Sequence, residues 1–127
     1  MTNSIKEIDG AQTIFVIGAN TTNAHPVIAQ RMRRASQNGA KLIVANPKEI
    51  DLVRAADYFI QHRPGSDTVL LMGMCRYIIE EDLHDKDFIQ EHCENFDEFK
   101  ASLDAYPPEF VEEITGVPWE QVAIVAR

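Results

Sequence analysis

A strand, a glycine turn and a helix start follow one another in Thr13-Ile14-Phe15-Val16-Ile17-Gly18-Ala19-Asn20-Thr21-Thr22-Asn23-Ala24-His25-Pro26. The first five residues are β-branched or aromatic, which is typical of a parallel strand covered on both faces. Pro26 suits the first turn of a helix. In α/β proteins ligands dock at such a junction, because the strand's carboxyl end opens into a crevice lined by backbone N–H groups. The stretch therefore predicts an α/β fold with a ligand site after its first strand.

Strands and helices alternate up to about residue 65, and helices alone follow. We expect strands at 13–17, 41–45 and 58–61, with helices at 5–10, 26–38 and 49–56. This order is that of a right-handed parallel βαβαβ unit. The predicted fold class is thus α/β, three-layer, with a short parallel sheet in residues 1–65 and a helical C-terminal half in residues 66–127, forming one α/β domain.

Three features indicate that the chain belongs to a larger protein. The helix expected from Asp67 to about Glu81 is apolar nearly all round, so it needs cover on more than one side. A sheet of three parallel strands is thin. The last helix reaches Arg127 without a C-cap. We therefore expect the remaining domains of a parent protein to be partners of this chain.

Composition narrows the classes of function and location. No apolar stretch approaches the roughly 20 residues of a membrane span, and the N-terminus has no secretory h-region, so we expect no membrane span and a cytoplasmic location, with a periplasmic parent as the alternative. The net charge of −8 argues against nucleic acid as a partner. Cys75 and Cys93 lack C-x-x-C spacing, so we expect no metal or iron–sulfur site on this chain.

Charge is distributed unevenly along the chain. Residues 1–64 carry eight Lys/Arg and five Asp/Glu, a net +3, whereas residues 65–127 carry four and fifteen, a net −11. The acidic half is interpreted as a solvated helical surface. The mildly basic first half suits a small phosphate ligand.

Three polar loops should gather at one sheet edge, because parallel strands end on the same side. They span residues 18–25, 46–50 and 63–67. Together they offer amide and hydroxyl groups, Lys48, Arg63 and Asp67, a set that suits a nucleotide: donors for phosphate, an amide for ribose and a carboxylate for a base. Lys48 and Arg63 also fit the simpler description of exposed loop charges.

An ordinary nicotinamide site is disfavoured. The G-x-G-x-x-G fingerprint needs three glycines, but the matching stretch Gly18-Ala19-Asn20-Thr21-Thr22-Asn23 has one. Asn46 stands where an acidic residue would hold the ribose, and no Walker lysine follows the loop. The residues alone leave Asp67 with two interpretations: a carboxylate that accepts from guanine N1–H and N2–H₂, or a residue that favours the dipole of its own helix.

Motifs along nearly the whole chain resemble the large subunit of molybdopterin-dependent formate dehydrogenases, as one interior domain, within the wider molybdopterin oxidoreductase superfamily. They include Phe15-Val16-Ile17-Gly18-Ala19-Asn20-Thr21-Thr22, Arg63-Pro64-Gly65-Ser66-Asp67 and Val111-Glu112-Glu113-Ile114-Thr115-Gly116-Val117-Pro118. The resemblance implies a cofactor of molybdenum or tungsten held by two molybdopterin guanine dinucleotides, one of which binds this domain. It places Gly18, Asn20 and Thr21 at the diphosphate, Asn46 at the ribose, and Gly65, Ser66 and Asp67 at the guanine, with Ala19, Pro47 and Lys48 completing the set. The family often has Asp-Pro-Arg where this chain has Asn46-Pro47-Lys48.

The resemblance also implies what the parent does and what this chain lacks. The parent carries a [4Fe–4S] cluster and a Cys or selenocysteine metal ligand with a nearby His and Arg, and it oxidises formate to carbon dioxide, passing electrons to an acceptor. None of those residues is placed on this chain, so the chain alone is expected to be inactive, with no catalytic or metal residue. Two alternatives are a cofactor-free relic domain, as in a respiratory complex I subunit, and an independent NAD-dependent enzyme.

Overall fold

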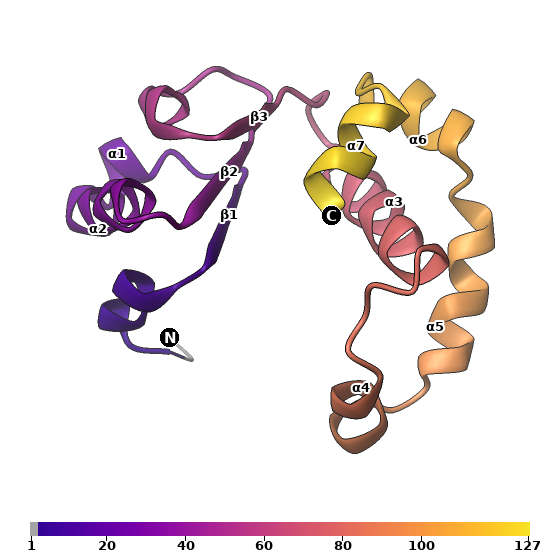
Figure 1. Cartoon of the computed structure of the whole chain (residues 1–127). Coiled ribbons are helices and arrows are strands. Elements are labelled where there is room, and N and C mark those ends of the chain that lie inside the picture. Colours follow the sequence, from indigo (N-terminus) through magenta and orange to yellow (C-terminus); the bar gives the residue numbers. More distant parts are fainter. Residues whose placement is uncertain (1–2) are drawn as a thin grey trace. The chain divides into compact units, whose positions relative to one another are not determined.

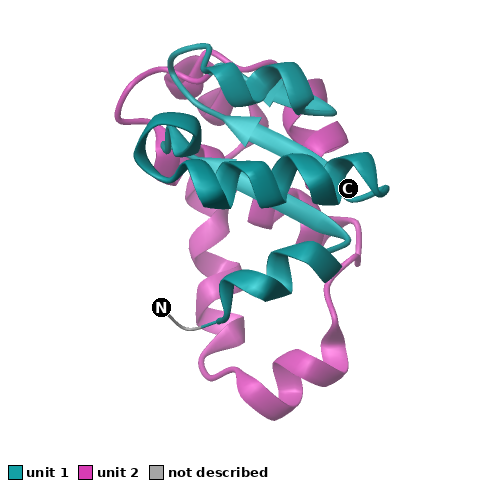
Figure 2. Ribbon diagram, turned by 90° about the vertical axis from the view of Figure 1, so that its left-hand side faces the viewer, with its two compact units in different colours: residues 1–61 teal, residues 62–127 magenta. Residues whose placement is uncertain are grey.

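The computed structural model describes residues 3–127, which divide into two compact units, each described here by itself. The first unit ends at Gln61 and the second runs from His62 to Arg127, drawn in different colours in Figure 2. The division falls slightly before residue 65, where the sequence pattern changes. That these units form one domain stays a prediction.

The first unit is built on a short parallel sheet. Its strands are β1 (Thr13–Ile17), β2 (Lys41–Ala45) and β3 (Tyr58–Ile60), hydrogen-bonded in the order β1-β2-β3. Val16 pairs with Val44, and Val44 with Phe59. The helical segments are η1 (Ile5–Gly10), α1 (Thr21–Ala24), α2 (Pro26–Gln37) and η2 (Asp51–Ala55). The predicted α/β class with a short parallel sheet is confirmed.

The core of this unit lies on one face of the sheet, where Figure 1 shows α1 and α2. Alternate residues of β1 and β2 are buried there against Ala35 of α2 and Leu52 of η2. Val27 is apolar and stands in the first turn of α2, but it is 66% exposed. Ala29 is fully buried instead, and the two residues lie about 200° apart around the helix axis.

The second unit is helical, as expected. It consists of α3 (Asp67–Glu80), α4 (Lys86–His92), α5 (Phe96–Ser102), η3 (Leu103–Ala105), α6 (Pro108–Thr115) and α7 (Trp119–Ala126). α3 packs against α6 and α7, and its buried positions are Leu70 and Gly73. The other apolar side chains of α3 keep partial exposure. No helix in residues 3–127 has the length and apolar character needed to cross a membrane.

Gly73 leaves room on α3 for Val111 of α6 to pack closely. A Cβ atom there would lie 2.8 Å from Val111 Cγ1 and 3.4 Å from Trp119 Cζ3. We expect Gly73→Ala to lower the free energy of unfolding by roughly 1 kcal/mol, because the overlap outweighs the gain in helix propensity. Chemical denaturation measures this. The control is Gly10→Ala, whose Cβ would meet nothing within 4 Å; a stabilised Gly73→Ala variant would contradict the close packing.

Asp57 ties β2 to the start of β3 and should make the first unit sensitive to acid. Its carboxylate accepts from the Leu42 N–H at 2.8 Å and pairs with Lys41 Nζ at 3.1 Å. The Leu42 backbone hydrogen bond, and after it the Lys41 side chain, lower the pKa of Asp57 below its usual value. A lowered pKa in the folded state stabilises the fold above the unfolded-state pKa, and this stability is lost as the pH falls through the folded-state pKa.

We therefore expect Asp57→Asn to be less stable than the native chain at pH 7, with the difference shrinking on acidification. Thermal unfolding between pH 7 and pH 3 measures it. Asp104→Asn removes the same charge from an exposed position and should match the native chain. If the stability difference between Asp57→Asn and the native chain stayed constant across this pH range, the charge of the Asp57 carboxylate would not contribute to the stability of the fold.

Candidate functional site

The first two predicted loops leave the sheet side by side. The Gly18 N–H donates to the Ala45 carbonyl at 3.0 Å, and the Asn46 N–H donates to the Ile60 carbonyl at 3.0 Å. Gly18 has a φ of 62°, a left-handed conformation that glycine adopts without strain. The structure thus brings together the segments after β1 and β2, as parallel pairing requires. The third loop belongs to the second unit.

A buried hydroxyl without a partner marks the loop after β1. Thr21 is 6% exposed, and its Oγ1 has no hydrogen-bond partner among the described residues. The neighbouring Thr22 differs, because its Oγ1 accepts from the Arg33 guanidinium at 3.0 Å. Leaving a buried hydroxyl unpaired costs about 1–3 kcal/mol. A ligand oxygen at this loop would remove that cost, so the donor set fits a phosphate group.

Backbone and side-chain donors surround Thr21. Asn20 precedes α1, is exposed, and makes no side-chain capping bond. Ala19 packs its side chain partly against the core, so only its backbone can serve a ligand. The Gly18 N–H is already used by the sheet. The groups at this loop that could donate to a ligand are therefore the Ala19 and Asn20 backbone and the Asn20 and Thr21 side chains, while Gly18 shapes the turn.

Asn46 holds the second loop in a tight turn. Its Oδ1 accepts from the Lys48 N–H at 2.9 Å, across Pro47, and the Pro47 carbonyl accepts from Gln61 Nε2 at 3.0 Å. Asn46 is buried, and in residues 3–127 its Nδ2 makes no hydrogen bond. The side-chain oxygen therefore shapes the turn, and the amide hydrogens are left as donors. Lys48 is exposed and forms no ion pair with the described residues.

The third loop is fixed to the end of α6. The Arg63 N–H donates to the Thr115 carbonyl at 2.8 Å, and the Arg63 guanidinium donates to the Glu113 carbonyl. Thr115 is fully buried, and its hydroxyl donates to the Val111 carbonyl and accepts from the Val117 N–H. These hydrogen bonds of Arg63 hold the loop in place, and the side chain itself stays exposed.

Ser66 closes this loop from within. Its hydroxyl donates to the Arg63 carbonyl at 2.7 Å, and its N–H reaches the same oxygen at 3.2 Å. Gly65 has a φ of 80°, which the turn requires. Ser66 stands at the N-cap position of α3, but its side chain makes no capping bond. Its hydroxyl proton is committed to the turn, so the side chain has no donor left for a base.

Asp67 begins α3 with its carboxylate held from inside the unit. Its Oδ1 lies 3.0 Å from His62 Nε2. The Asp67 side chain is 43% exposed, whereas the His62 side chain is enclosed. This contact of His62 was not among the features predicted from the sequence. The sequence did contain a signal for this contact. His62 and Asp67 are five residues apart, and the Pro64-Gly65 turn between them can bring a histidine close to the first residue of a helix.

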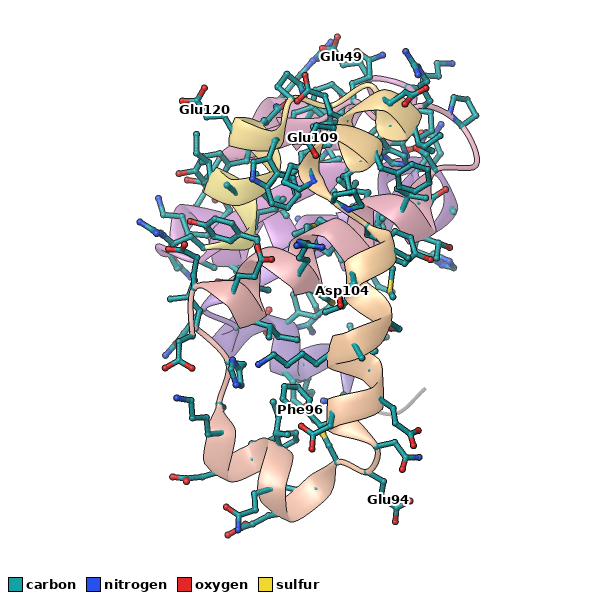
Figure 3. The ribbon with its side chains drawn as sticks, turned by 90° about the vertical axis from the view of Figure 1, so that its right-hand side faces the viewer. Glu49, Glu94, Phe96, Asp104, Glu109 and Glu120 are labelled. Carbon is teal, nitrogen blue, oxygen red and sulfur yellow. The ribbon has the colours of Figure 1, made fainter. Side chains whose placement is uncertain are left out.

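The other ionisable groups of the second unit do not converge. Figure 3 shows Asp104, Glu109 and Glu120 in separate helical segments and Glu94 in the connection between α4 and α5. The described residues contain no cluster of His, Cys, Asp or Glu suited to a metal ion. Burial raises the pKa of the Cys75 thiol, which favours its neutral form.

A cavity of about 570 Å³ lies at α4 and α5, apart from the predicted loops. Its lining includes Ile89, Phe96 and Glu98, and no residue of the predicted site. His84 packs against Phe96 there, with ring centroids 5.4 Å apart. The lining includes His84, whose buried Nδ1 has no hydrogen-bond partner among the described residues, but it includes no residue at the end of a strand.

Comparison with known proteins places the chain in a family. A sequence model of the family "Molybdopterin oxidoreductase" matches residues 1–125. The chain is 42% identical over 127 residues to formate dehydrogenase H of Escherichia coli, covering all of this chain and 18% of the relative. It is 40% identical over 127 residues to the F420-dependent formate dehydrogenase subunit alpha of Methanocaldococcus jannaschii, covering 19% of that protein.

A solved structure agrees with this assignment. Acetylene hydratase from Pelobacter acetylenicus superposes with a TM-score of 0.84 and 30% identity, covering 96% of this chain and 18% of that one. The chain thus spans about a fifth of the length of these relatives. The resemblance to molybdopterin-dependent formate dehydrogenases is confirmed, and the chain belongs to the molybdopterin oxidoreductase family.

Proposed function

We propose that this chain is the part of a formate dehydrogenase that binds one molybdopterin guanine dinucleotide through its nucleotide end. Family membership and formate dehydrogenase relatives support a molybdopterin cofactor in the parent protein. The observation that supports the nucleotide-binding assignment is the buried, unpaired Thr21 hydroxyl on the segment after β1, which leaves the sheet next to the segment that begins with Asn46. When bound in the parent, the metal–pterin group supplies the oxidation of formate to carbon dioxide.

Each loop has a role that follows from its free groups. The Ala19 and Asn20 N–H groups and the Thr21 hydroxyl donate to the diphosphate, and Gly18 shapes the turn that presents them. Asn46 donates its amide hydrogens to the ribose oxygens, with Pro47 and Lys48 completing the turn. Lys48 adds a positive charge near the phosphates, although it lacks the planar fork of an arginine.

The base is read at the third loop. Gly65 and Ser66 set the turn, and the Asp67 carboxylate accepts from guanine N1–H and N2–H₂. An adenine ring offers one donor on the corresponding edge, beside a ring nitrogen that repels the carboxylate. This contact therefore favours guanine over adenine.

No residue of this chain is proposed to be catalytic, and the chain alone is expected to have no activity. The [4Fe–4S] cluster and the metal ligand belong to the parts of the parent outside these 127 residues. A [4Fe–4S] centre needs several cysteines, and Cys75 and Cys93 are the two that this chain has.

Titration of the 127-residue chain with GDP and ADP, followed by backbone amide NMR, tests the proposal. We expect GDP to shift amides around Gly18, Asn46 and Asp67, and to bind more tightly than ADP. Asp67→Asn should bring the two affinities together, because a carboxamide offers one acceptor and one donor where guanine needs two acceptors. Asp104→Asn is the charge-matched control and should keep the GDP preference.

The alternative of a cofactor-free relic domain predicts a different result. No shift with either nucleotide, together with a parent protein that releases no guanine nucleotide on acid hydrolysis, would contradict the proposal. Binding of NADH in preference to GDP would indicate an independent NAD-dependent enzyme.

A further inference from the structure

We propose that His62 is a positioning residue that fixes the Asp67 carboxylate for recognition of a guanine base. The inference rests on the proposed function, because it concerns how Asp67 reads the base. The distance of 3.0 Å between His62 Nε2 and Asp67 Oδ1 is that of a hydrogen bond. His62 donates from the inside of the second unit, and Asp67 keeps its outer side open.

Burial separates the tasks of the two side chains. His62 is 1% exposed, and its Nε2 already faces the Asp67 carboxylate, so we place its effect on a ligand through that carboxylate. Asp67 is 43% exposed at its side chain, which leaves its outer lone pairs accessible. A carboxylate has about four acceptor positions, and His62 occupies one of them. About three positions are left, and two are enough for the two-donor edge of guanine.

The environment of the second ring nitrogen of His62, Nδ1, indicates which tautomer the ring adopts. Nδ1 is buried and has no partner among the described residues. If Nδ1 carried the only proton, a buried N–H would be unpaired and Nε2 would turn a lone pair toward a carboxylate. With the proton on Nε2, the donor is satisfied by Asp67 and only a lone pair remains unpaired. The geometry therefore assigns the Nε2–H tautomer.

The segment between His62 and Asp67 is held by hydrogen bonds that involve neither of these side chains. Arg63 is bonded through its backbone to Thr115 and through its guanidinium to the Glu113 carbonyl. Ser66 is bonded twice to the Arg63 carbonyl. Both neighbours of the Pro64-Gly65 turn are therefore fixed, and the separation of His62 from Asp67 is set before any ligand arrives.

This arrangement gives His62 an effect on specificity. An aspartate that rotates freely loses rotational freedom when it accepts two parallel hydrogen bonds. A carboxylate already fixed by His62 loses less, so the two-donor edge of guanine gains more than hypoxanthine, which has N1–H but lacks the 2-amino group. His62 therefore determines how strongly the site discriminates GDP from IDP, and not how it binds phosphate.

The test compares GDP, IDP and ADP affinities for the native chain, His62→Leu and His62→Gln, by calorimetry or NMR titration. We expect the native chain to prefer GDP over IDP by about five- to tenfold, the equivalent of one net hydrogen bond. His62→Leu should reduce this ratio to about twofold or less while changing IDP affinity little. His62→Gln supplies an amide donor and should recover part of the ratio.

Two failures can be told apart. Equal affinities of the native chain for GDP, IDP and ADP would contradict the proposed function. A native preference for GDP that survives unchanged in folded His62→Leu would overturn the role of His62 alone. Imidazole ¹⁵N NMR on the native chain needs no variant: a proton on Nε2 is expected, and an Nε2 without a proton would overturn the proposal even if His62→Leu fails to fold.

Discussion

The parallel pairing of β1 with β2 is the constraint on which the first half of the candidate site depends. The Gly18 N–H continues the ladder by one bond, to the Ala45 carbonyl, and only then does the chain turn away. Because the strands run parallel and in register, the turn after β1 opens beside the turn after β2. Thr21 and Asn46 therefore sit at neighbouring strand ends although they are far apart in sequence. A shift of register would separate them.

The third loop is built by a different principle. This loop follows β3 and does not continue the hydrogen-bond ladder of the sheet. Its shape comes from hydrogen bonds to the end of α6 and from the Ser66 hydrogen bonds within the turn. Arg63 and Ser66 look like ligand-binding residues in the sequence because they are polar residues in a glycine loop. In the structure, the Ser66 hydroxyl and one guanidinium nitrogen of Arg63 donate to backbone carbonyls and hold the loop. Asp67 is left as the one charged group of this loop with open acceptor positions.

The strands could be predicted well from the sequence because each is a short β-branched or apolar run between turn residues. This pattern is typical of a strand and of few other elements. Helix ends and faces were harder. The expected helix at 49–56 forms as the shorter η2, and α1 arises inside a segment that looked like a polar loop. Val27 shows the limit of periodicity: an apolar residue in the first turn of a helix can fit the pattern and still face away from the sheet.

The site residues show a related limit. Sequence spacing can place Asn46 and Asp67 at loops, but it does not say which polar atoms are already satisfied. That required hydrogen bonds: the Asn46 oxygen is used by Lys48, the Ser66 hydroxyl by Arg63, and Asp67 is held by His62. His62 was missed because a histidine without ligand spacing carries no local signal. Its significance comes from burial together with one distance to a residue across a turn.

The names of the relatives indicate that this domain does not by itself determine which reaction the parent protein catalyses. Proteins called formate dehydrogenase and acetylene hydratase share this part of the chain, although the names describe different reactions. A domain that binds the nucleotide end of a cofactor, and that has no metal-ligand cluster in its described residues, is compatible with either chemistry. On this proposal, the residues that select the substrate lie in the four-fifths of the parent outside this chain, while Asp67 and His62 select the cofactor's base.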